Sequence, residues 1–208
     1  NRALELSMFL TLPAAIALMA IPAPIIHTVF EHGAFTRADT LAVAPAVLAF
    51  ASGLPAFSLS KVFQPGFYAR EDTRSPFRYA VWSMVINAAL AIGRLPWIGW
   101  LAAAIATTVS AWAMVLQLWL GSRQMGDAVQ LDDRFLTRVP RMVLASTLMG
   151  LVLWGLMTAL AVPLATPGIR TAALGVMVLA AMAVYFGTVL MLGGMSWVEL
   201  KGAFRRQR

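Results

Sequence analysis

Six long apolar stretches, separated by short segments that hold nearly all the charges, run through this chain of 208 residues. They cover residues 6–30, 41–69, 77–93, 95–120, 142–164 and 171–195. A helix needs about 20 mainly apolar residues to cross the hydrocarbon core of a bilayer. Only 12% of the residues are charged, about half the share usual in soluble domains. The sequence therefore predicts an all-α polytopic membrane protein with six transmembrane helices.

Local signals mark the ends of some of these helices. Thr36 and Asp39 in "TRAD" have the spacing of a capping box, with Asp in place of Glu or Gln. Ser75 followed by Pro76 predicts an N-cap with proline at the first helical position. The third stretch, 77–93, is the shortest, and we expect its helix to end before the arginine that follows it.

Basic residues are distributed unevenly between the two sides of the predicted membrane. If the chain crosses at each stretch, 12 Lys and Arg lie on the side of the two termini and three lie on the other side, while one lysine falls within a span. Short cytoplasmic segments carry an excess of Lys and Arg. Both ends of this chain are therefore predicted to be cytoplasmic.

The lysine within a span is Lys61, about nine residues or 13 Å of helix from Arg70. Ser58, Gln64 and Tyr68 lie three or four residues apart along the same predicted helical face. A charge at this depth costs at least a few kcal/mol when it faces lipid. Either Lys61 reaches the membrane surface or pairs with a carboxylate elsewhere, or it belongs to a polar pathway. We favour the pathway, because ionisable residues inside membranes usually serve function.

Polar side chains also recur on one face of the third and fourth stretches. Tyr79, Ser83 and Asn87 repeat at a spacing of four in the third, and Thr107 and Ser110 share a face of the fourth. Three polar stripes in successive spans predict a shared polar interior, to which Ser83 and Asn87 would contribute. The fifth and sixth stretches carry one tyrosine as their only ionisable group and several small residues, which is typical of closely packed, lipid-facing helices.

Motifs of enzymes and of metal or nucleic-acid sites are weak. Asp132 and Asp133 lack the further acid three residues on that a prenyl-chain enzyme would need, and no phosphate-binding loop occurs. His27, Glu31 and His32 have poor spacing for metal ligands on one helix, so we interpret them as solvated loop residues. The net charge of +7 follows membrane topology, without a basic face interleaved with aromatics. We predict no enzyme activity, cofactor, metal or nucleic-acid partner.

Residues 30–90 contain three motifs in a characteristic order: "FEHGAFTRADT", "GLPAFSLSKVFQPGFYAREDTRSP" and "INAAL". Together they resemble the lipid II flippase family, also called MurJ or MviN, of the multidrug/oligosaccharidyl-lipid/polysaccharide exporter superfamily. The resemblance implies a fourteen-helix exporter fold with two lobes around a central cavity, of which this chain would supply the C-terminal portion, spans nine to fourteen. It implies flipping of the undecaprenyl-pyrophosphate-linked peptidoglycan precursor, lipid II, across the bacterial cytoplasmic (inner) membrane.

The resemblance also implies a division of the chain into three parts. Residues 1–122 would be four helices of the C-terminal lobe that line the cavity. Residues 123–141 would form a cytoplasmic loop. Residues 142–208 would be two additional helices, which form a groove outside the lobe, and a basic tail. The expected partners are the lipid-linked precursor, membrane lipids and the remaining N-terminal helices of the same protein.

Individual residues acquire roles from the same resemblance. Lys61 is similar to the cavity lysine of the C-terminal lobe, placed to attract pyrophosphate or sugar-peptide groups. The turn after this span would lie at the cytoplasmic mouth, where ion pairs can form and break between conformational states. This implied cytoplasmic gate consists of Arg70, Glu71 and Asp72.

Two further expectations concern ions and substrates. Some members of the family place sodium between an Asn, an Asp one turn later and a Thr on the next helix. Asn87 and Thr107 match two of these positions, but Ala91 stands where the Asp would be, so only a weak cation site is expected. An alternative function is that of a multidrug or polysaccharide exporter of the same superfamily, although the motifs of residues 53–76 favour the flippase.

Overall fold

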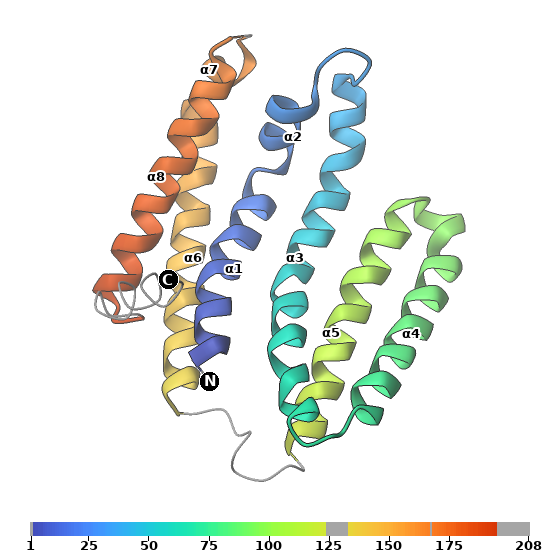
Figure 1. Ribbon diagram of the computed structural model, residues 1–208. Coiled ribbons are helices and arrows are strands. Elements are labelled where there is room, and N and C mark those ends of the chain that lie inside the picture. Colours follow the sequence, from blue (N-terminus) through green and yellow to red (C-terminus); the bar gives the residue numbers. More distant parts are fainter. Residues whose placement is uncertain (1, 124–132, 167, 195–208) are drawn as a thin grey trace.

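The structure, a computed structural model, describes residues 2–123, 133–166 and 168–194, and every regular element in these ranges is a helix. Six of the helices are long and apolar enough to cross a membrane, which confirms the predicted class. They stand side by side in a single row in the order α8, α6, α1, α3, α5 and α4 (Figure 1). The helices are α1 (Arg2–Ala20), α2 (Pro22–Phe30), α3 (Arg37–Tyr68), α4 (Arg74–Ile98), α5 (Leu101–Arg123), α6 (Asp133–Ala159), α7 (Ala161–Ala165) and α8 (Arg170–Met191).

The first predicted span is not one continuous helix, because the chain breaks at Ile21 between α1 and α2. Pro22 follows the break at the first position of α2. Proline has a fixed φ and no N–H, so it suits the start of a helix and disrupts the interior of one. The break lets α2 pack against both α3 and α8. Segments far apart in sequence thereby meet on the side of the helix layer where α2 and α3 are joined.

The capping box predicted at the start of α3 is confirmed. The backbone N–H of Thr36 donates to Asp39 Oδ2 at 2.7 Å, and the N–H of Asp39 donates to Thr36 Oγ1 at 3.4 Å. The N-cap predicted at Ser75 is wrong, because α4 already begins at Arg74. Asp72 takes the capping role there: its Oδ1 accepts the backbone N–H of Ser75 at 3.0 Å.

Two predicted boundaries differ from the observed ones. We expected the third helix to end before Arg94, but α4 continues to Ile98 and the chain reverses at Gly99, whose φ of 58° favours glycine. We expected a loop over residues 123–141, but α6 begins at Asp133, so the later part of that segment is helical. The reason is tertiary, since the first turns of α6 pack against the start of α1.

This contact is a cluster of three charges around one buried carboxylate. The carboxylate of Glu5 on α1 lies 3.2 Å from Arg138 Nη1 and 3.4 Å from Arg134 Nε, both on α6. Glu5 is only 4% exposed, whereas the side chain of Arg134 is 39% exposed. A buried carboxylate needs such partners because leaving water is costly for a charge. The cluster fixes one end of α6 against α1.

Apolar packing joins other pairs of helices. Phe9 on α1 is fully buried, and its ring lies 5.5 Å from that of Tyr185 and 5.7 Å from that of Phe186 on α8. The Tyr185 hydroxyl donates to the backbone carbonyl of Phe9 at 2.7 Å. On the other side of the row, a Cβ added to Gly53 would lie 3.1 Å from Thr108 Oγ1, so α3 and α5 approach closely there.

Candidate functional site

Lys61 lies on an exposed face of α3, together with half-buried Gln64 and exposed Tyr68. Phe63 and Phe67, on the same stretch of helix, point into the apolar core instead. No side chain in the described ranges pairs with the Lys61 ammonium. The structure therefore brings three of the predicted pathway residues together on one open surface, which we call the Lys61 face.

Ser58 belongs to a different surface of α3. Its hydroxyl lies 2.9 Å from Thr11 Oγ1 of α1, in a hydrogen bond between the two helices. Hydroxyl pairs of this kind hold membrane helices together. Ser58 thus contributes to the α1–α3 contact beside the Lys61 face.

The polar stripes of α4 and α5 face one another. Ser83 donates through its hydroxyl to the carbonyl of Ser110 at 2.6 Å, and Asn87 Nδ2 donates to the hydroxyls of Thr107 and Ser110, each at 3.2 Å. Thr107 Oγ1 in turn donates to the carbonyl of Ala103 at 2.8 Å. The structure brings Asn87 and Thr107 together as expected, but their polar atoms are used in bonds between and within these helices. Helix α5 separates most of this seam from α3.

The predicted gate residues form the exposed turn between α3 and α4. Asp72 caps α4, and hydrogen bonds from the hydroxyl and backbone of Ser75 lower the pKa of its carboxyl. Glu71 has a φ of 60°, in the left-handed region that is uncommon for residues other than glycine. Within the part of the chain that the structure describes, the side chains of Arg70 and Glu71 have no partner, so both are available to another segment.

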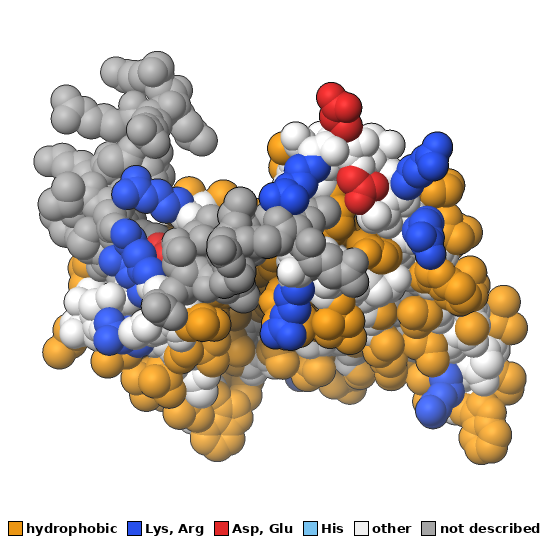
Figure 2. All heavy atoms as spheres, turned by 90° about the horizontal axis from the view of Figure 1, so that it is seen from below, with side chains coloured by type: hydrophobic (Ala, Val, Ile, Leu, Met, Phe, Trp, Pro, Cys, Tyr) orange, Lys and Arg blue, Asp and Glu red, His pale blue; other side chains and the backbone are white. Residues whose placement is uncertain are grey.

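A view onto the helix tips on the side of the α3–α4 turn shows basic side chains spread across this surface, with few acids between them (Figure 2). The α3–α4 turn and the starts of α1 and α6 all lie at this end (Figure 1). This is the arrangement that the alternation of six spans predicts for the side rich in Lys and Arg. The described basic residues of these segments and of the adjacent end of α5 are Arg2, Arg70, Arg74, Arg78, Arg123, Arg134, Arg138 and Arg141.

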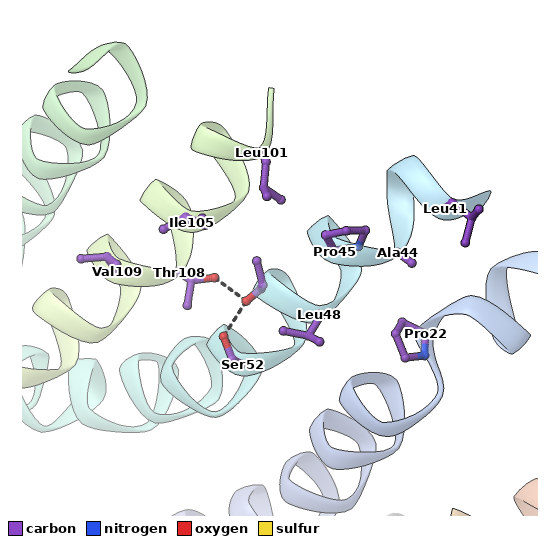
Figure 3. Close-up of a pocket in the computed structure, with 11 residues that line it drawn as sticks. Pro22, Leu41, Ala44, Pro45, Leu48, Ser52, Leu101, Ile105, Thr108 and Val109 are labelled. Atoms are coloured by element: carbon purple, nitrogen blue, oxygen red, sulfur yellow. Dashed lines mark hydrogen bonds between the residues drawn. The ribbon is translucent and has the colours of Figure 1, made fainter. Parts of the chain in front are cut away.

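A cavity of about 690 Å³ lies between α2, α3 and α5, in the half of the helix layer nearer the α2–α3 turn (Figure 3). Its walls are aliphatic apart from two hydroxyls, those of Ser52 and Thr108. Both hydroxyls donate to the carbonyl of Ala49, each at 2.7 Å. The cavity therefore offers little to a polar ligand.

This cavity is separate from the Lys61 face. Ser52, which lines the cavity, and Lys61 are nine residues apart on the same helix. Nine residues correspond to about two and a half turns, which places the two side chains on opposite faces of α3. A single row of helices has two broad surfaces, and Lys61, with Gln64 and Tyr68 beside it, lies on the one away from this cavity.

A second apolar cavity, of about 320 Å³, lies between α1, α6 and α8, and we call it the C-terminal groove. Its walls include Pro13 on α1, Leu153 on α6, and Val178 and Met182 on α8. Val178 and Met182 are exposed on the outer surface of α8, so the groove is bordered by side chains that lipid can reach. Its chemistry suits an alkyl or prenyl chain.

The interpretation of His27, Glu31 and His32 as solvated loop residues is right for His32, which is exposed in the α2–α3 turn with Glu31 beside it, but His27 lies in α2 and side-chain contacts join the group to α3 and α8. Glu31 Oε2 accepts from His27 Nδ1 at 2.6 Å and from Thr40 Oγ1 at 2.9 Å. Arg170 Nη2 lies 3.2 Å from the carbonyl oxygen of Glu31 and 3.1 Å from His32 Nε2. The spacing of four between His27 and Glu31 could have indicated their pairing, whereas Arg170 is too distant in sequence to predict. No three His, Cys, Asp or Glu side chains among the described residues are placed to hold a metal, and Asp132 lies outside those residues.

Six bilayer-length helices in the described ranges, with Lys61 within one of them, define a polytopic α-helical membrane protein. The model of the family "Lipid II flippase MurJ" matches residues 1–169. The chain therefore belongs to the MurJ family, as residues 30–90 predicted.

Individual relatives agree with this assignment. The chain is 37% identical over 209 residues to a probable lipid II flippase MurJ of Rhizobium meliloti (strain 1021), covering 99% of this chain and 39% of the relative. It is 30% identical over 207 residues to the lipid II flippase MurJ of Burkholderia cenocepacia J2315, covering 99% and 39%. A solved structure, "Lipid II flippase MurJ, inward closed conformation", matches with a TM-score of 0.74 and 25% identity over 92% of this chain and 38% of that one. The chain thus spans about two fifths of the length of these relatives.

Proposed function

We propose that a protein carrying this segment flips the undecaprenyl-pyrophosphate-linked peptidoglycan precursor, lipid II, from the inner to the outer leaflet of the bacterial inner membrane. The observation that carries this proposal is the family match over residues 1–169. The segment would supply spans nine to fourteen, with residues 1–122 forming part of the cavity-lining lobe. The remaining helices of the same protein and the surrounding lipids would be its partners.

The Lys61 face is the proposed contact for the anionic headgroup. A pyrophosphate is a compact anion, and an ammonium is a compact, strongly hydrated cation with three donors. Gln64 and Tyr68 lie beside Lys61 on the same open surface and supply further hydrogen-bonding groups. Ser58, Ser83 and Asn87 would act on the pathway indirectly, by holding α3 and α4 to their neighbours.

The turn between α3 and α4 is the proposed gate at the cytoplasmic mouth. Asp72 orders the turn by capping α4, which leaves exposed Arg70 and Glu71 to pair with other segments in one conformational state. Asn87 and Thr107 would form at most a weak cation site, because their polar atoms already bind one another and α5.

The orientation of the chain can be tested with single cysteines, because this segment has none. Arg37 and Arg74 are the exposed first residues of α3 and α4. Because the two helices run in opposite directions, these residues lie on opposite sides of the helix layer (Figure 1). In a full-length protein without other cysteines, we expect a membrane-impermeant thiol reagent added outside intact cells to label Arg37→Cys and not Arg74→Cys. The reverse pattern would show that the predicted orientation is inverted.

The C-terminal groove is the proposed path of the polyprenyl tail, because its apolar wall continues to the lipid-facing surface of α8. Val178 lines this groove, whereas neighbouring Leu179 is more exposed and lies outside it. We expect Val178→Trp to fill the groove and slow lipid II delivery to the outer leaflet severalfold, while Leu179→Trp leaves it nearly unchanged. The measurement is the rate at which lipid II becomes accessible outside cells that depend on the variant, at matched protein abundance. Equal rates for the two variants would exclude the groove from the transport path.

A further inference from the structure

Arg170, at the first position of α8, forms a polar contact with the turn between α2 and α3. Its Nη2 donates to the carbonyl oxygen of Glu31 at 3.2 Å and contacts His32 Nε2 at 3.1 Å. We call the contacts of Arg170 with Glu31 and His32 the α8 tie. The α8 tie and the Glu5 cluster lie at opposite ends of the helices (Figure 1). The tie holds α8 to the α2–α3 turn, and the cluster holds α6 to α1.

The chemistry of the guanidinium fixes the protonation state of His32 in this contact. Arginine has five N–H donors and no acceptor. His32 Nε2 must therefore accept the hydrogen bond from Arg170, which requires a neutral imidazole with its proton on Nδ1. Protonating Nε2 would remove the acceptor and place two cations about 3 Å apart. The α8 tie is thus incompatible with a charged His32.

His27 responds to a proton in the opposite way. Its Nδ1 donates to the Glu31 carboxylate at 2.6 Å, a bond that is present in both the neutral and the charged imidazole. Protonating its Nε2 adds a positive charge next to a carboxylate and strengthens the pair. The hydrogen bond from His27 also lowers the pKa of Glu31, so this carboxyl stays ionised in mild acid.

The other charged groups near the tie belong to the α2–α3 turn and to the start of α3. Arg37, at the start of α3, is close enough to Glu31 to act on it electrostatically. Asp39 is engaged with Thr36 in the capping box and does not take part in the tie. Neither α7 nor the adjoining end of α6 has an ionisable side chain. A charged His32 would therefore meet the Arg170 guanidinium, while the Glu31 carboxylate is already bound by His27 and Thr40.

We propose that the α8 tie is a proton-sensitive contact, which holds the start of α8 beside the α2–α3 turn while His32 is neutral and releases it when His32 is charged. Histidine side chains ordinarily change charge between about pH 5 and 8. Because residues 178–186 of α8 form one wall of the C-terminal groove, release would let this wall move. The proposal concerns the position of α8 alone, so its test is independent of the substrate that the protein moves.

The test is a distance measurement across the tie at two pH values. Spin labels are placed at Ala34, in the α2–α3 turn, and at Ala172, near the start of α8, both of which are exposed. In the full-length protein carrying this segment, in lipid nanodiscs, we expect a short, narrow distance distribution at pH 8. At pH 5 we expect the longer-distance population to rise by about tenfold or more, which is the scale set by one hydrogen bond to a charged group.

Two matched variants identify the proton acceptor. A glutamine amide oxygen can accept from Arg170 but does not titrate, so His32→Gln should keep the short distance at both pH values. His27→Gln should leave the response to pH in place. An unchanged distance in the unmodified protein between pH 8 and 5, or a full pH response in His32→Gln, would overturn the proposal.

Discussion

Replacing Lys61 by alanine is expected to abolish growth of cells that depend on the full-length flippase, while the protein remains inserted and abundant. The ammonium lies on an open face of α3 with no partner in the described residues, so little of the packing depends on it. Its proposed role is to hold an anionic headgroup during transport. Losing a hydrogen bond to a charged group costs about 1.5–3 kcal/mol, which corresponds to a decrease in transport rate of at least about tenfold.

Two variants separate the charge from the volume of this side chain. Lys61→Arg keeps a cation at the site, with a planar shape and different hydrogen bonding, and should retain part of the activity. Val62→Ala removes a half-buried neighbour and should support normal growth. The measurement is growth complementation, with membrane abundance determined for each variant. Normal growth with Lys61→Ala at equal abundance would show that the lysine is only structural or reaches the membrane surface.

The Glu5→Gln substitution should have the largest effect on stability. It keeps the shape of the side chain but removes the buried carboxylate that binds Arg134 and Arg138 on α6. Removing one partner of a buried ion pair costs about 3–5 kcal/mol. We expect about 3 kcal/mol in the free energy of unfolding, the lower end of this range, because Arg134 is 39% exposed and can reach water.

A control for this prediction lies at the same end of the molecule. Glu71 is exposed, and its side chain has no partner in the described ranges, so Glu71→Gln should change the free energy of unfolding by less than about 0.5 kcal/mol. Both variants can be compared by chemical unfolding of the purified protein in detergent. Equal stability of Glu5→Gln and the unmodified protein would show that the cluster does not hold α6 to α1.

Some features of the fold could be predicted from short-range sequence patterns. Backbone groups inside a bilayer must be hydrogen-bonded within the protein, so a sufficiently long apolar stretch becomes a helix. This is why the six spans are correct although several of their boundaries are not. The capping box of Thr36 and Asp39 was predictable for a similar reason, because both partners lie within one turn. The alternation of the six spans predicted which helix ends lie on the same side.

The partner of each polar face was decided by the tertiary structure alone. Periodicity shows that Ser83 and Asn87 share a face of α4, but that face meets α5 rather than the surface with Lys61. The contacts of Glu5 with Arg138 and of His32 with Arg170 join residues 133 and 138 positions apart. Sequence determined the helices, since their hydrogen bonds are local, whereas the order of helices in the row depends on side-chain packing between distant segments, for which one sequence carries no comparable signal.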